Sequence, residues 1–164
     1  MVAKVILVPT DFSSTSDAAL RYATEMALAL GARIFLLHVP GKTGEHFEAN
    51  FPFACFDTAG RERFDSFLTA EEVERLHPEY VVRAGGPAEE VVRYADVCGA
   101  DLIIMGTHGR TGLAHALMGS VAEQVVRTAS CPVLLIRSGT RLLHGAEVRT
   151  DEGVPVARRA PASA

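Results

Sequence analysis

The sequence has no tryptophan, only three cysteines and no long apolar run. Cys55, Cys98 and Cys131 are far apart, odd in number and part of no paired motif, so they indicate neither a disulfide framework nor a zinc site. The longest apolar stretches, residues 5–8 and 102–105, are much shorter than the roughly 20 residues that cross a bilayer, and the N-terminus lacks a signal-peptide pattern. We therefore expect a cytoplasmic protein with no membrane partner.

An excess of positive charge is absent as well. Sixteen Lys and Arg stand against 20 Asp and Glu, a formal net charge of −4, which gives no overall attraction to nucleic acid. Any phosphate-bearing ligand must then be held by local geometry. The histidines, His38 among them, have no metal-ligand spacing, so we expect no metal held by the protein itself and assign His38 a structural or surface role. With 164 residues, 48% of them hydrophobic, the chain suffices for one well-packed domain.

Apolar segments alternate with amphipathic ones along the chain. Continuous apolar runs are typical of strands covered on both faces, and they occupy residues 4–9, 33–39, 80–82, 101–105 and 132–136. Helical spacing, with capping residues or glycines at its ends, occupies residues 13–31, 69 onward, 87–99 and 120–129. This alternation predicts a parallel α/β sheet with helices on both faces, in which ligands bind beyond the carboxyl ends of the strands. Residues 41–60 have no clean period, and we expect a loop there.

The most informative segment follows the fourth expected strand and has the pattern Gly106-x2-Gly109-x9-Gly119-Ser120 directly before a helix. Glycine occurs where a backbone approaches a ligand closely or takes a positive φ, and a helix N-terminus offers unpaired N–H groups and the positive end of its dipole to phosphate. The missing lysine excludes a Walker A loop, and the position after the fourth strand excludes the dinucleotide fingerprint. From the residues alone, a phosphate cradle and an ordinary strand-to-helix turn are equally good interpretations.

This spacing resembles the nucleotide-binding signature of the universal stress proteins of the ATP-binding kind. The resemblance extends to residues 8–13, 37–39, 86–88 and 131–134, and covers about residues 2–137. We therefore expect a Rossmann-like fold: an open five-stranded parallel sheet in the order 3-2-1-4-5, helices on both faces, and the last strand at the edge. The resemblance implies a homodimer through that strand, Pro132 to Ile136. The expected organisation is a nucleotide-binding domain over residues 1–137 and a disordered C-terminal tail over residues 138–164.

The resemblance also implies where a nucleotide would lie. Adenine would meet backbone groups near Val39 and the Pro9 to Asp11 turn, and ribose would lie near Asp11 and Gly106. The phosphates would lie against residues from His108 to Val121. The residues implied in binding are Pro9, Thr10, Asp11, Val39, Met105, Gly106, His108, Gly109, Gly119, Ser120 and Val121. Ala122 is a departure, because many relatives have Ser or Thr there, and one hydroxyl contact to the phosphate tail is missing. Magnesium is expected only through phosphate oxygens and water.

Several alternatives remain open from the sequence. Asp11 would also serve as an ordinary helix cap, and His108 as a neutral loop residue. The leading hypothesis is a stress-response protein that binds ATP or another adenine nucleotide as a switch or sensor. One alternative is a slow hydrolase or a protein that phosphorylates itself at Thr111 or Ser120, although no base is evident. The other is a dimeric interaction scaffold with a vestigial site.

Overall fold

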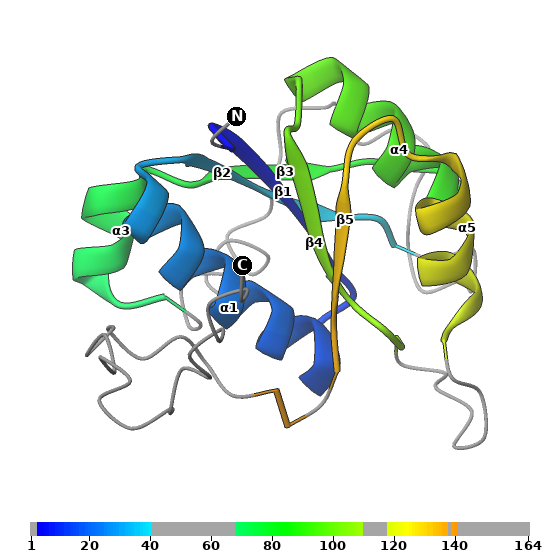
Figure 1. The fold of residues 1–164 in the computed structure, drawn as a ribbon, viewed down its shortest axis with the longest axis horizontal. Helices are drawn as coiled ribbons and strands as arrows, with labels where there is room; N and C mark the ends of the chain where they lie inside the picture. The colour runs from blue at the N-terminus through cyan, green and yellow to red at the C-terminus, as the bar shows by residue number, and fades with distance from the viewer. Residues whose placement is uncertain (1–2, 41–67, 110–117, 138, 141–164) are drawn as a thin grey trace, which may run out of the picture.

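The computed structural model describes residues 3–40, 68–109, 118–137 and 139–140. The loop expected over residues 41–60 and nearly all of the expected tail lie outside these residues, as do Arg110 and Thr111. The elements in chain order are β1 (Val5–Thr10), α1 (Ser14–Leu30), β2 (Arg33–His38), α3 (Ala70–Leu76), β3 (Glu79–Val82), α4 (Pro87–Cys98), β4 (Leu102–Gly106), α5 (Ser120–Thr128) and β5 (Val133–Ile136) (Figure 1).

The strands form one parallel sheet in the order β3-β2-β1-β4-β5, which confirms the predicted fold. The chain builds outward from β1 through β2 to β3. It then returns through α4 and adds β4 and β5 on the other side of β1. This reversal makes β1 and β4 neighbours, with Ile6 opposite Leu102.

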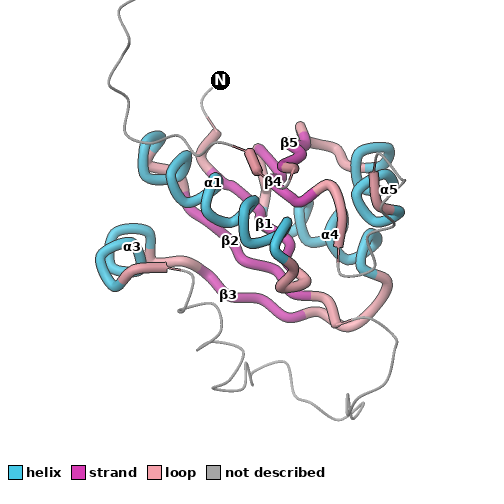
Figure 2. Tube along the Cα trace, turned by 90° about the horizontal axis from the view of Figure 1, so that it is seen from below, coloured by secondary structure: helices cyan, strands magenta, loops and turns pink. Residues whose placement is uncertain are grey.

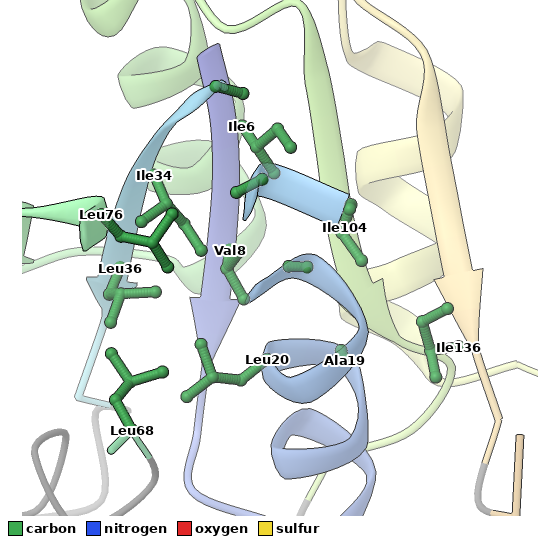
Figure 3. Packing of buried hydrophobic residues seen from close by; sticks show 13 residues of the cluster. Ile6, Val8, Ala19, Leu20, Ile34, Leu36, Leu68, Leu76, Ile104 and Ile136 are labelled. Carbon is green, nitrogen blue, oxygen red and sulfur yellow. The ribbon is translucent and has the colours of Figure 1, made fainter. Parts of the chain in front are cut away.

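Helices cover both faces of the sheet. Figure 2 shows α1 and α3 on one side of the strands and α4 and α5 on the other. Residues of β1 alternate between the two layers. Ile6 and Val8 pack under α1 (Figure 3), whereas Leu7 packs against the α4 and α5 layer. All three are fully buried. Burial on both faces explains why the first strand is a continuous apolar run rather than an alternating one.

The helix ends follow the capping residues in the sequence. Ser13 caps α1, and Gly31 ends it in the left-handed conformation at φ 63°. At α3, Thr69 and Glu72 form a capping box, in which each side chain accepts from the backbone N–H of the other residue. The strand boundaries agree with the expected ranges to within one residue; β1, for example, starts and ends one residue later than predicted.

Candidate functional site

The carboxyl ends of all the strands lie at the same edge, because the sheet is parallel. The chain leaves this edge in opposite directions after two neighbouring strands: from β1 into α1 on one face, and from β4 toward α5 on the other. In open α/β sheets such a switch point is where ligands bind. Thr10 and Gly106, the last residues of the two strands, flank it.

A hydrogen-bonded turn follows β1. The Thr10 hydroxyl accepts from the Phe12 N–H at 3.0 Å and donates to Ser16 Oγ at 3.1 Å. Asp11 Oδ1 accepts from the Ser13 N–H at 3.1 Å, while Ser13 itself caps α1. The interpretation of Asp11 as the helix cap is therefore wrong: it shapes the turn before the cap. Phe12 has φ 60°, a left-handed conformation that costs a non-glycine residue roughly 1 kcal/mol.

Close approach explains the three glycines of the signature. None of them has a positive φ. A Cβ atom added at Gly109 would lie 2.5 Å from Asp11 Oδ2, and one at Gly106 would lie 3.0 Å from Thr15 Cγ2. At Gly119 it would lie 3.3 Å from the Thr107 carbonyl oxygen. From the sequence, these glycines could serve either a positive φ or a close approach of the backbone. The structure shows close approach between parts of the protein.

The N-terminus of α5 faces the same loop. Gly119 is its N-cap, makes no side-chain cap hydrogen bond, and donates its N–H to the Thr107 carbonyl at 2.8 Å. Ser120 is exposed at the first helical position. The backbone N–H groups of the first turn have no partner within the helix, and the helix dipole adds partial positive charge there. Ala122 is 2% exposed and packs toward the core.

The remaining predicted residues lie at or beside this edge. Val39, directly after β2, and Met105 in β4 are buried in the same cluster, against which Val121 also packs. Pro9 lies in β1, and His108 Nδ1 is 3.1 Å from Thr107 Oγ1. The structure thus brings every predicted site residue to the carboxyl ends of β1, β2 and β4 or to the start of α5.

Sequence reasoning missed two residues of this edge. His38 Nδ1 lies 2.8 Å from the Thr10 carbonyl oxygen, and its ring centroid is 4.7 Å from that of Phe12. A carbonyl oxygen only accepts, so Nδ1 carries the proton and donates it. The register of β1 and β2 sets Thr10 opposite His38. The expected ranges, 4–9 and 33–39, do not pair these residues, because β1 ends one residue later than expected, and nothing in the sequence indicated the left-handed Phe12.

The chain matches the model of the universal stress protein family over residues 3–137. It belongs to this family. Universal stress protein MJ0531 of Methanocaldococcus jannaschii is 35% identical over 147 residues, which cover 82% of each chain. Among solved structures, protein MJ0577 aligns at 27% identity with a TM-score of 0.66, covering 86% of this chain and all of the other. A universal stress protein solved in complex with cAMP shares the fold, with 23% identity, a TM-score of 0.57, and coverage of 84% of this chain and 98% of that one.

In this universal stress protein a charged cluster adjoins the site at the end of β3. The Arg83 N–H donates to the His38 carbonyl at 3.1 Å, and the Arg83 side chain binds Glu90 of α4 at 3.3 Å. Arg93 Nη2 lies 2.6 and 2.7 Å from the two Glu90 oxygens. Burial acts to raise the pKa of Glu90, but the hydrogen bonds from Arg93 and Arg83 outweigh it and hold that pKa below its ordinary value.

Two features are absent from the described residues of this universal stress protein. Nowhere among them do three or more His, Cys, Asp or Glu side chains gather as they would around a metal ion. None of the helices formed by these residues combines the length and the hydrophobicity needed to cross a membrane.

Proposed function

We propose that this universal stress protein binds an adenine nucleotide at the switch point between β1 and β4, and that the nucleotide acts as a switch or sensor in a cytoplasmic stress response. The observation that carries the proposal is the convergence of three groups: the Asp11 carboxylate, the Gly109 backbone against it, and the N-terminus of α5. Together they offer a hydrogen-bond acceptor for hydroxyl groups and hydrogen-bond donors for phosphate oxygens at one edge of the sheet.

Each part of a nucleotide has a chemically suitable partner there. Buried Val39 and Met105 provide apolar contact for adenine. Asp11 can accept from ribose hydroxyls, since a carboxylate is an acceptor only. The first-turn N–H groups of α5 suit phosphate oxygens. The resemblance to the ATP-binding signature supports the same assignment, as does the family member solved with cAMP.

The outer phosphates have fewer partners than the inner one. Ala122 brings no hydroxyl, and Glu123, in the first turn of α5, brings a carboxylate that Arg127, at 3.8 Å, neutralises only in part. ATP remains the principal candidate, and we expect it to gain little affinity over ADP or AMP. Magnesium would bind through the phosphates and water, because hard cations with few protein ligands keep their hydration shell.

Equilibrium binding to nucleotide-free protein tests the proposal. Titration calorimetry with ATP, ADP and AMP should give dissociation constants between about 1 μM and 1 mM, roughly −8 to −4 kcal/mol, with no phosphate release above a buffer blank. If none of the three nucleotides gave a heat of binding or competed for the site, the proposal would be wrong. Release of phosphate would point instead to the hydrolase.

Asp11→Asn is the most informative variant. The asparagine Oδ1 can still accept from the Ser13 N–H, so the turn should persist while the charge and one acceptor are lost. We expect ATP affinity to fall about tenfold, in the range of one hydrogen bond to a charged group. Glu74→Gln, on an exposed position of α3, makes the same change in charge and should leave affinity unaltered. Equal effects in both variants would contradict a local role for Asp11.

A second proposal concerns assembly. β5 is the last strand of the sheet order, and its residues Val133, Leu134 and Leu135 are only half-buried. An edge strand with apolar side chains favours pairing with another chain. Together with the family resemblance, this supports a homodimer formed through β5. If that dimer acted without nucleotide, the protein would be the dimeric interaction scaffold with a vestigial site.

A further inference from the structure

His38 connects the ends of β1 and β2 at the carboxyl edge of the sheet. It is the last residue of β2, and Val39 follows it at the proposed adenine contact. Its side chain crosses to β1, where Nδ1 donates to the Thr10 carbonyl at 2.8 Å and the ring lies against Phe12, with 4.7 Å between centroids. The ring is half-buried.

The hydrogen bond to Thr10 acts on Asp11 through the peptide plane. The Thr10 carbonyl and the Asp11 N–H belong to one planar unit, so holding the carbonyl sets the direction in which Asp11 leaves the strand. The next residue, Phe12, is left-handed at φ 60° and is held there by its N–H bond to Thr10 Oγ1 and by the His38 ring. Without these contacts the turn would relax toward ordinary φ values, and the Asp11 carboxylate would leave its position against Gly109.

We infer that His38 is a positioning residue for the nucleotide site: through the Thr10 carbonyl and the Phe12 ring it holds the Asp11 carboxylate where it selects ribose over deoxyribose. This inference rests on the proposed function. It differs from a purely structural role because it concerns a ratio of affinities, whereas loss of folding would weaken all nucleotides alike.

The experiment compares ATP with 2′-deoxy-ATP and 3′-deoxy-ATP by titration calorimetry. We expect wild-type protein to prefer ATP over at least one deoxy form by about tenfold, the range of one hydrogen bond to a carboxylate. His38→Ala should reduce that ratio to about two or less. In the Asp11→Asn background, His38→Ala should have no further effect on the ratio, because the two residues act in series.

Conservative variants keep the test sharp if His38→Ala folds poorly. The amide nitrogen of His38→Asn can occupy the place of Nδ1 and should retain most of the ribose preference. The amide of His38→Gln lies one methylene farther out and should lose it. His77→Asn, at the exposed left-handed C-cap of α3, is a matched control that should not change the ratio.

The outcomes separate the two proposals. No binding of any of these nucleotides by wild-type protein would remove the proposed function, and this inference with it. Binding with no ribose preference, or a preference that persists in both His38→Ala and His38→Gln, would overturn the role of His38 and leave nucleotide binding intact. An equal loss of affinity for all three nucleotides in every His38 variant would assign His38 to structure alone.

Discussion

At the scale of single residues, glycine serves two distinct purposes in this protein. Gly109 has no positive φ, but a Cβ atom there would lie 2.5 Å from Asp11 Oδ2. Gly31 is the reverse case: a Cβ atom would meet nothing within 4 Å, but the residue is left-handed at φ 63°. The first glycine leaves room for the Asp11 side chain, and the second ends a helix.

Gly109→Ala should therefore weaken nucleotide binding while changing stability little. The methyl group displaces the end of the Asp11 side chain, which can rotate away, rather than backbone. We expect a loss of about tenfold in ATP affinity, equal to that of Asp11→Asn, and a change of less than about 0.5 kcal/mol in the free energy of unfolding. Calorimetry and urea denaturation measure the two quantities on the same samples.

Gly31→Ala is the opposite control. Alanine in the left-handed conformation should lower the free energy of unfolding by about 1 kcal/mol and leave ATP affinity unchanged. If Gly109→Ala instead destabilised the protein as much as Gly31→Ala and bound ATP normally, the close approach to Asp11 would be a packing feature without a role in binding.

Residue types and spacing predicted which residues gather at the site but not how they hold one another. The spacing from Gly106 to Gly119 indicated the family, and the end of a buried strand indicated Asp11. The contact between Gly109 and Asp11 could not be predicted from the sequence. It joins the loops after β1 and β4, and these strands are neighbours only because of the strand order of the whole sheet. The left-handed Phe12 was beyond reach for another reason: phenylalanine has no preference for that conformation.

At the scale of elements, the β3–α4 connection depends on the carboxylate of Glu90. Glu90 as a whole is 8% exposed, and its carboxylate is held by Arg83 at the end of β3 and by Arg93 on the same helix. Burial opposes its charge, but the two arginines more than compensate, and its folded-state pKa lies below the ordinary 4.5. A carboxyl group with a lowered folded pKa stabilises the fold above its unfolded pKa, and that stabilisation is lost as pH falls through the folded value.

We therefore expect the free energy of unfolding to decline as the pH falls from about 5 toward 3, and Glu90→Gln to flatten that decline. At neutral pH the variant should be less stable by about 1 kcal/mol, a modest value because Arg93 is largely exposed and its interaction is screened by solvent. Urea denaturation at a series of pH values measures both effects. Glu74→Gln makes the same change in charge and is the control. If the free energy of unfolding of Glu90→Gln depended on pH as that of wild type does, this account would be wrong.

Elements were more predictable than contacts because their signals are local. The signals at helix boundaries, such as Gly31 at the end of α1 and the Thr69–Glu72 box at the start of α3, act within a few residues of sequence. The strand order is not local, since β4 pairs with β1 across nearly a hundred residues. It followed from the resemblance to a family rather than from periodicity. The boundaries of β5 differ from the expected range because its first expected residue, Pro132, contributes a carbonyl to the ladder but has no N–H.

At the scale of the whole molecule, the open edge of β5 has a defined set of backbone groups. The carbonyls of Pro132 and Ile136 accept from Ile103 and Thr107 on the β4 side. Along a strand of a parallel sheet, the backbone N–H and C=O groups of successive residues point to alternate sides. Those of Leu134 therefore also point toward β4, and those of Leu135 point outward. Strand pairing with a second copy of the chain would use the outward groups, those of Leu135 among them.

Substitution by proline distinguishes these two neighbours. Leu135→Pro removes an N–H from the open edge, where proline is tolerated, and should yield a monomer that still binds ATP. Leu134→Pro removes an N–H from the β4–β5 ladder and should destabilise the fold itself. Light scattering should give a mass near twice 17.5 kDa for wild type and near 17.5 kDa for Leu135→Pro. A dimer that survives in a folded Leu135→Pro variant would show that the subunits meet elsewhere, and loss of ATP binding in that monomer would show that the site depends on the partner chain.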